Sequence, residues 1–300
     1  MSKALCTTVL VLCLLTCAVA QSRTEKNIIY GTYSGLALLM NVLHPEKPNG
    51  YGLVLVPGSG WHTPQTYDAV LIKDGTSALF GSVPRLLEAG YTLFVVNHRA
   101  APRFRYPAAV EDVQRAVRFV RFHAAEYRIT DHICAVGYSS GGHLALLLGV
   151  LPDTADPSDS DPVNRVSSRV QCVVASAAPA DLEHKADDVP MASFLGAPPP
   201  SIRPDPVAAR IYRAASPVTH VSKASAPLLL IYGDADETVR FSQGESMMAA
   251  ATQVGAEVKL IRVPGGDHGF GANVGKHPEW PDIFVEMVRW LDQHLRTSAR

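Results

Sequence analysis

Short apolar runs alternate with segments of helical periodicity over most of the chain. The apolar runs lie within residues 51–58, 91–99, 134–138, 170–180, 227–234 and 258–265. The helical segments lie within residues 77–90, 107–127, 140–149, 241–255 and 281–295. Several runs are apolar at successive positions, as strands covered on both faces must be. This alternation predicts a mainly parallel β-sheet joined by right-handed helical crossovers.

Three segments depart from this alternation. Residues 27–32 and 36–45 flank a three-residue turn and predict an antiparallel hairpin. Residues 152–169 hold four aspartates among prolines and serines, which indicates a solvated loop. A calcium loop is the alternative there, but the spacing lacks the glycine and terminal glutamate of an EF-hand. The third segment, about 182–226, is long and proline-rich, and we expect a small cap or lid, with a plain connector as the alternative.

The first twenty residues differ from the rest of the chain. Lys3 precedes an apolar run that ends in small residues at Ala18 and Ala20, the layout of a secretory signal peptide. We therefore expect residues 1–20 to be removed and the mature protein to be exported, to the periplasm or the cell exterior. The run is short for a membrane span, so a retained anchor is the weaker alternative. The other alternative is a lipoprotein attached to the membrane through Cys17.

Composition limits the classes of fold and of binding partner that the chain can have. The chain has 300 residues, 47% of them hydrophobic and 18% charged, with a formal net charge of −1. Residues 21–300 can therefore build one domain with a substantial core, and a chain without a basic stripe is not expected to bind nucleic acid.

Cys134 and Cys172 remain after signal cleavage, each in an apolar run. Two buried thiols are the preferred interpretation and a disulfide between neighbouring strands is the alternative. Neither has a Cys-x-x-Cys partner, so we expect no thiolate metal site.

The segment Cys134–Gly149 passes from an apolar strand to an apolar helix with almost no connecting loop. The pattern Gly137-x-Ser139-x-Gly141 stands at the join; it is weak alone but strong between a strand and a helix. Such a turn strains the serine backbone, so the neighbouring residues must lack bulk. It also projects the hydroxyl above the sheet edge and leaves helix N–H groups free to bind an oxyanion. We therefore predict Ser139 as a nucleophile.

A serine hydroxyl needs a base, and the base needs an orienting carboxylate. His268 follows the last predicted strand in a glycine-rich loop and is the candidate base, whereas other histidines lie on predicted helices or in irregular segments. Asp234 and Asp236 both follow the preceding strand and are the candidate carboxylates. The candidate oxyanion donors are the backbone N–H groups of Ser140, Ser59 and Gly60. An ordinary turn is the alternative interpretation of the loop that holds the last two.

At these residues the chain resembles the α/β-hydrolase superfamily. It is most similar to the hormone-sensitive-lipase-like and acetyl esterase branch, including feruloyl and acetylxylan esterase-like members. The resemblance runs from about Gly52 to Leu295, with "GYSSGG" similar to the family's nucleophile turn and "GGDHGF" to its histidine box. The stretch from Gly233 resembles a Gly-x-x-Asp-x-x-Val pattern, which implies Asp236 as the carboxylate. Residues 57–61 read PGSGW where the family usually has His-Gly-Gly-Gly-Trp, so a histidine that often braces this loop is missing.

The residues and the resemblance together predict an α/β-hydrolase fold with helices on both faces of the sheet. They also predict an exported serine hydrolase that cleaves carboxylic esters with short acyl groups or carbohydrate-linked alcohols, without cofactor or metal. Residues near Trp61 and Asp181 are expected to form walls of the substrate pocket. The alternatives are a prolyl-oligopeptidase-like serine peptidase and a non-catalytic binding protein of the same fold. The sequence assigns no oligomeric state.

Overall fold

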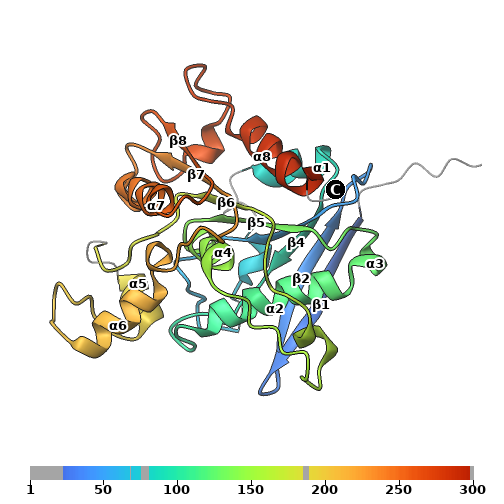
Figure 1. The fold of residues 1–300 in the computed structure, drawn as a ribbon, viewed down its shortest axis with the longest axis horizontal. Helices are drawn as coiled ribbons and strands as arrows, with labels where there is room; N and C mark the ends of the chain where they lie inside the picture. Colours follow the sequence, from blue (N-terminus) through green and yellow to red (C-terminus); the bar gives the residue numbers. More distant parts are fainter. Residues whose placement is uncertain (1–22, 68, 76–80, 185–188, 298–300) are drawn as a thin grey trace, which may run out of the picture.

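Eight strands form one sheet in the computed structural model, which describes residues 23–67, 69–75, 81–184 and 189–297 (Figure 1). The strands are β1 (Arg23–Tyr33), β2 (Leu36–His44), β3 (Gly52–Val56), β4 (Thr92–Val96), β5 (Ile133–Tyr138), β6 (Val173–Ser176), β7 (Leu228–Gly233) and β8 (Val258–Val263). Their order across the sheet is β1-β2-β4-β3-β5-β6-β7-β8. The β1–β2 and β2–β4 pairs are antiparallel and all other pairs are parallel. The predicted parallel sheet and N-terminal hairpin are both confirmed.

The helices follow the predicted segments with two differences. They are α1 (Ser82–Glu88), α2 (Ala108–Phe122), α3 (Ala124–Tyr127), α4 (Ser140–Val150), α5 (Val189–Leu195), α6 (Pro206–Ala215), α7 (Ser242–Gln253) and α8 (Ile283–Thr297). Short 3-10 helices are η1 (Ile72–Asp74), η3 (Pro162–Arg165), η4 (Pro217–Thr219) and η5 (Phe270–Asn273). In the first segment the described helix begins at Ser82, after Gly81 in a left-handed conformation (φ 72°), and residues 77–80 of the prediction lie outside the described residues. The helix predicted over 107–127 breaks at His123, whose Nδ1 donates to the Phe119 carbonyl at 2.9 Å.

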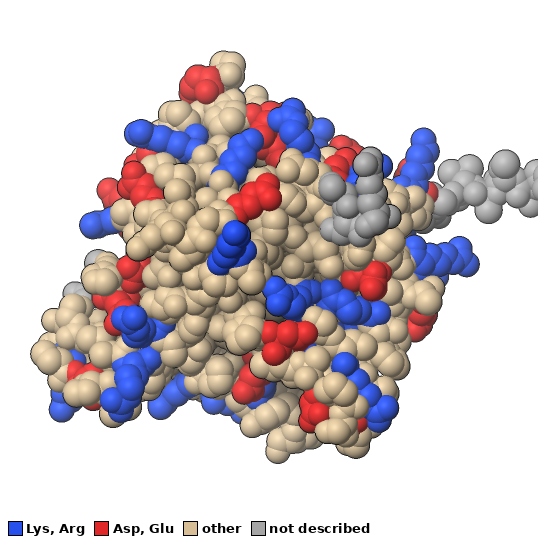
Figure 2. All heavy atoms as spheres, in the orientation of Figure 1, with Lys and Arg blue, Asp and Glu red and all other residues tan. Residues whose placement is uncertain are grey.

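Each face of the sheet has its own hydrophobic core, because successive strand side chains point to opposite faces. On one face, α2 and α4 cover apolar side chains of the strands, among them Val54, Phe94, Ala135, Val173 and Leu230. On the other face, α1 and α8 cover Leu53, Val95, Val136, Val174 and Ile231. Within the part of the chain that the structure describes, no helix is long and apolar enough to cross a bilayer. Basic and acidic side chains are intermixed over the face seen in Figure 2.

Cys134 and Cys172 form a disulfide, with their Cα atoms 4.8 Å apart. Cys134 lies in β5 and Cys172 directly precedes β6, and the Ala135 N–H donates to the Cys172 carbonyl at 3.0 Å. Neighbouring strands are separated by about 4.8 Å, a spacing that suits a disulfide between side chains on one face. The preferred prediction of two free thiols is wrong, and the alternative is confirmed.

The strand order brings several loops to one edge of the sheet. The chain passes from β3 to β4 on one side and later returns to β5 on the other side of β3. At such a reversal, the loops leaving the carboxyl ends of the central strands separate and leave a crevice. The loops after β3, β5, β7 and β8 all leave from this carboxyl edge, since these strands are parallel. Helices α5 and α6 of the proline-rich segment form a group beside α4 and α7 (Figure 1).

Candidate active site

Ser139 joins β5 to α4 in a backbone conformation that is rare for serine. Its φ is 53° and its ψ is −125°, and a conformation of this kind costs about 1–3 kcal/mol in a residue other than glycine. The Ser139 N–H donates to the Ser176 carbonyl at 2.9 Å, and the Ser139 carbonyl accepts the His143 N–H at 3.0 Å. Hydrogen bonds on both sides therefore hold the strained residue in place.

Gly137 and Gly141 leave room for this turn. A Cβ atom on Gly137 would lie 2.3 Å from the Gly141 carbonyl oxygen, and one on Gly141 would lie 2.0 Å from the Val56 carbonyl oxygen. Neither contact is sterically allowed. The predicted need for small neighbours is confirmed, and the second contact shows what the space is for: it lets the end of β3 approach the start of α4.

His268 and Asp236 form a hydrogen-bonded chain with Ser139. The Nε2 atom of His268 is 3.1 Å from Ser139 Oγ, and its Nδ1 atom is 2.7 Å from Asp236 Oδ2. The Asp236 side chain is completely buried, and its Oδ1 accepts the N–H groups of Thr238 and Val239 at 2.9 and 2.8 Å. A carboxylate held in this way accepts the Nδ1 proton and leaves Nε2 as the acceptor that faces the serine hydroxyl.

Main-chain and side-chain hydrogen bonds fix the loops that carry these residues. The Ala235 N–H donates to the Gly266 carbonyl at 3.0 Å, which joins the loop after β7 to the loop after β8. The Tyr138 hydroxyl donates to the His268 carbonyl. Tyr138 directly precedes Ser139, the candidate nucleophile, so this bond ties the loop that holds His268 to the end of β5.

Asp234, the alternative carboxylate, has other partners. Its Oδ2 accepts Arg262 Nε at 2.7 Å, and its Oδ1 accepts the Gly265 N–H at 2.5 Å. The Arg262 guanidinium and this N–H lower the pKa of Asp234. Asp234 thus helps to fold the loop after β8, and the structure brings Asp236 to His268.

The loop after β3 lies against the start of α4, as expected of an oxyanion loop. A Cβ atom on Gly58 would lie 2.9 Å from Ser139 Cβ. The Ser59 N–H, one predicted oxyanion donor, donates to the Ser140 hydroxyl at 2.9 Å. The Gly60 N–H has no acceptor among the residues that the structure describes. The structure therefore places the loop after β3 against Ser139 and Ser140, and one of the three predicted donors, the Ser59 N–H, is already engaged.

The sequence profile of the BD-FAE family matches residues 40–250. The chain belongs to the BD-FAE family of α/β-hydrolases. It is 29% identical over 252 residues to the probable carboxylic ester hydrolase LipM of Mycobacterium tuberculosis, an alignment that covers 82% of this chain and 56% of LipM. It is 27% identical over 257 residues to the acetylxylan esterase of Xylanibacter ruminicola, covering 84% of this chain and 47% of that protein. The chain thus spans about half the length of these curated relatives.

A solved structure of similar fold supports the assignment to this family. The truncated form of a carbohydrate esterase from gut microbiota superimposes with a TM-score of 0.76 at 26% sequence identity. The match covers 93% of this chain and 98% of that one. The α/β-hydrolase fold predicted for this BD-FAE protein is therefore confirmed over nearly the whole chain.

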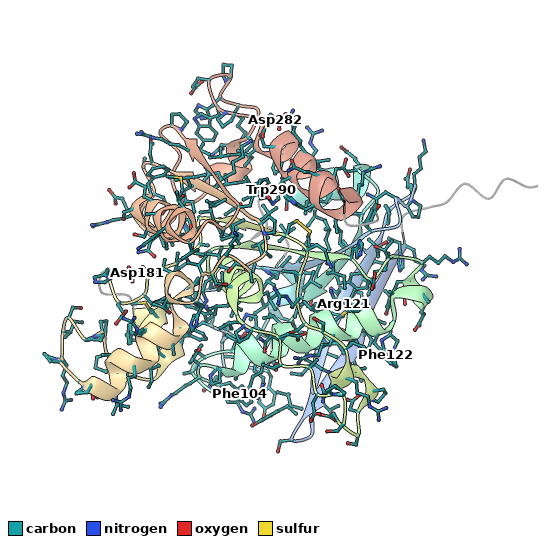
Figure 3. The ribbon with its side chains drawn as sticks, viewed as in Figure 1. Phe104, Arg121, Phe122, Asp181, Asp282 and Trp290 are labelled. Atoms are coloured by element: carbon teal, nitrogen blue, oxygen red, sulfur yellow. A yellow bond between two sulfur atoms is a disulfide. The ribbon has the colours of Figure 1, made fainter. Side chains whose placement is uncertain are left out.

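Two predicted pocket residues have other surroundings in this BD-FAE protein. Trp61 is 2% exposed, and its indole ring stacks on Phe194 at 4.8 Å instead of lining an open pocket. The Asp181 N–H donates to Gln243 Oε1 at 2.8 Å, and the Asp181 carboxylate pairs with the exposed His184 at 2.8 Å. Asp181 lies between α5 and α7 in the view of Figure 3. Both residues are near the carboxyl edge, but their contacts are structural ones.

Two side chains that the sequence did not predict contact Trp61 in the loop after β3 of this BD-FAE protein. His143 accepts the Trp61 indole N–H, with a nitrogen–nitrogen distance of 3.1 Å. Phe194 comes from α5 in the proline-rich segment. His143 stands four residues after Ser139, a spacing that places it on the first turn of α4 beneath the nucleophile turn. That spacing was the available signal, whereas nothing in the sequence points from Phe194 to Trp61.

Proposed function

We propose that this protein is a serine esterase that hydrolyses carboxylic esters through an acyl-enzyme. The observation that carries the proposal is the chain of two hydrogen bonds from Ser139 through His268 to the buried Asp236. A nucleophile, a base and an orienting carboxylate in this order are the working parts of acyl transfer. The names of the curated relatives and of the similar solved structure support the same reaction class.

In the proposed reaction, Ser139 Oγ attacks the ester carbonyl carbon while His268 Nε2 takes the hydroxyl proton. Asp236 stabilises the resulting imidazolium and does not take the proton itself. The negative oxygen of the tetrahedral intermediate accepts the N–H groups of Ser140 and Gly60, and that of Ser59 if the Ser140 hydroxyl rotates away. His268 then gives its proton to the leaving alcohol. Water activated by His268 attacks the acyl-enzyme and releases the acid and the free serine.

The substrates we propose are short-chain esters of carbohydrates. An open cavity of about 750 Å³ lies between Thr63–Tyr67 and the segment Asn97–Ala101 after β4. Such a cavity is large enough to hold the bulky alcohol group of a carbohydrate ester. The acetylxylan esterase relative and the carbohydrate esterase structure support this choice by their names.

We further propose that the protein acts outside the cytoplasm. The N-terminal segment with signal-peptide features, residues 1–20, lies outside the described residues. The disulfide between Cys134 and Cys172 supports export, because disulfides persist mainly in oxidising compartments. Expression of the full chain with its N-terminus intact, followed by fractionation and N-terminal sequencing of the mature protein, tests this proposal. Protein that stays in the cytoplasm with an unprocessed N-terminus would contradict it.

Hydrolysis of small chromogenic substrates tests the reaction class. We expect the purified protein to cleave p-nitrophenyl acetate and acetylated xylo-oligosaccharides, and not aminoacyl p-nitroanilides. Ser139→Ala should lower kcat by about 10⁴-fold or more and abolish labelling by a fluorophosphonate. Ser242→Ala, at an exposed position of α7, is the matched control and should leave both unchanged.

Each other outcome names a different function. Cleavage of the anilides with little ester turnover would identify a peptidase of the prolyl-oligopeptidase type. Absence of both activities together with absence of fluorophosphonate labelling would indicate a binding protein. Ester turnover that survives Ser139→Ala would refute the assignment of the nucleophile.

A further inference from the structure

The oxyanion loop contains an unusual backbone segment. Gly60 and Trp61 follow one another with φ values of 63° and 57°. The left-handed region suits glycine but is unfavourable for a bulky aromatic residue. Such a conformation persists only when the surrounding structure fixes it, and residues of this kind are concentrated at functional sites. The contacts of Trp61 therefore decide where the Gly60 N–H points.

The indole ring of Trp61 is fixed on two sides. It is 2% exposed and stacks on Phe194 of α5, with 4.8 Å between ring centroids and 7° between the planes. Its Nε1–H donates to His143 Nδ1 at 3.1 Å, and the two rings meet edge to face. The main chain is held as well, because the Trp61 carbonyl accepts the Ala101 N–H at 2.8 Å.

His143 can serve this bond in only one protonation state. Its Nε2 atom is 2.8 Å from the Ala215 carbonyl oxygen, and a carbonyl can only accept. Nε2 therefore carries the proton, and Nδ1 presents the lone pair that Trp61 needs. Complete burial lowers the pKa of His143 to about 4, so the ring is neutral at ordinary pH. The donor–acceptor order is thus fixed from Trp61 through His143 to α6.

The geometry points to His143 as a positioning residue for the oxyanion hole: by accepting the Trp61 indole N–H it holds the strained Gly60–Trp61 segment against the first turn of α4. The same turn carries Ser140, whose hydroxyl accepts the Ser59 N–H. His143 thus takes over the bracing that a histidine at position 57 would give, and it acts through Trp61 without touching the substrate. The inference rests on the proposed esterase reaction.

Three substitutions test the inference in the full-length enzyme, with p-nitrophenyl acetate as substrate. Trp61→Phe keeps the ring on Phe194 but removes the N–H donor, and His143→Phe keeps a ring but removes the acceptor. Each should lower kcat about 10- to 100-fold with KM changed less than about threefold, because misplacement of about 1 Å can cost 10²-fold in rate. His143→Gln offers an acceptor oxygen and a donor nitrogen and should restore most of kcat. The Trp61→Phe/His143→Phe double variant should lose no more kcat than His143→Phe alone, since that variant already lacks the hydrogen bond to Trp61 as well as the one to Ala215.

Further measurements separate positioning from loss of folded protein. Titration of active sites with a fluorophosphonate puts kcat on a per-active-enzyme basis. The affinity of an alkylboronic acid, whose tetrahedral adduct with Ser139 places an oxygen in the oxyanion hole, should fall by the same factor as kcat/KM. Trp290→Phe is the matched control, because this indole is also buried but lies on α8, and its kcat should stay within about twofold of wild type.

Normal kcat and boronate affinity per active site in Trp61→Phe and His143→Phe would overturn the inference. If His143→Phe does not fold, the comparison of Trp61→Phe with His143→Gln decides in the same way. Loss of activity in Ser139→Ala combined with normal kcat and boronate affinity in Trp61→Phe would support the proposed esterase reaction and contradict only the role of His143. Normal activity of Ser139→Ala would remove the reaction itself.

Discussion

His143 makes the stability of the fold depend on pH in a defined window. Burial lowers its pKa from 6.5 to about 4 in the folded protein, whereas the unfolded chain keeps the ordinary value near 6.5. Below pH 6.5 the unfolded state therefore binds a proton that the folded state does not, and the free energy of unfolding falls with pH down to about 4. For these two pKa values the loss between pH 7 and pH 5 is about 2 kcal/mol, since each pH unit within the window contributes about 1.4 kcal/mol.

Replacing His143 with Gln removes this proton and keeps both hydrogen-bonding atoms. On going from pH 7 to pH 5, the wild-type Tm should fall about 3–4 °C more than the Tm of His143→Gln, given the unfolding entropy of a chain of this size. Scanning calorimetry at the two pH values measures the difference. Carboxylates and His98, whose pKa burial also lowers, contribute equally to both proteins and cancel. His277→Gln, at an exposed position, should behave as wild type.

A parallel fall of both Tm values would refute the reasoning. It would mean that the folded protein accepts a proton on His143 as readily as the unfolded chain does. A charged imidazole has no lone pair at Nδ1, so the bond to Trp61 would then be absent from the native state. The result would contradict the neutral, buried ring and its role in holding the oxyanion loop.

Three further substitutions have definite expected outcomes. Asp236→Asn should lower kcat about 10⁴-fold with little change in KM, because the amide would face His268 with a donor and impose the wrong tautomer. Kinetics after active-site titration measure kcat, and a loss of less than tenfold would contradict this expectation. Gly141→Ala should give insoluble or inactive protein, since the new Cβ would lie 2.0 Å from a carbonyl oxygen of β3. A soluble variant with wild-type Tm and kcat would contradict this expectation and show that the turn can relax. Cys134→Ala/Cys172→Ala should lower the free energy of unfolding, measured by urea denaturation, by about 4 kcal/mol, because the disulfide spans 38 residues. The reduced wild type should have the same stability as this variant, and equal stability of oxidised wild type and variant would count against a stabilising crosslink.

Much of the fold could be predicted from the sequence because it depends on local apolar patterning. Strands covered on both faces must be apolar at successive positions, and β7, with all of its residues buried, is an example. The same patterning indicated the positions of Ser139 and His268, because loops at the carboxyl ends of parallel strands converge. The choice between Asp234 and Asp236 needed the resemblance, since both follow β7 and only the contact of Asp234 with Arg262 separates them.

Features that depend on partners distant in sequence could not be predicted. The disulfide requires Cys134 and Cys172 to lie side by side on neighbouring strands, and apolar runs carry no information on strand order. Trp61 follows a glycine-rich loop and was expected to face the substrate, but Phe194 of a distant segment covers its ring. His143 lies on a predicted helix, and its proposed role depends on its contact with Trp61 and not on the sequence around it.

The first turn of α4 connects Ser139, the proposed nucleophile, to the loop after β3, the proposed oxyanion loop. Ser139 precedes this turn in a strained conformation, while Ser140 and His143 within it accept hydrogen bonds from the loop that holds the second strained residue, Trp61. Both conformations are thus fixed by the same few residues before any substrate binds, and donors that need no rearrangement stabilise a developing oxyanion most effectively. If His143 braces the loop as proposed, Pro57 can stand where related proteins usually have a histidine, because the bracing comes from α4. It follows that a change in this single helical turn should affect catalysis and the local fold together, whereas a change at position 57 should affect neither strongly.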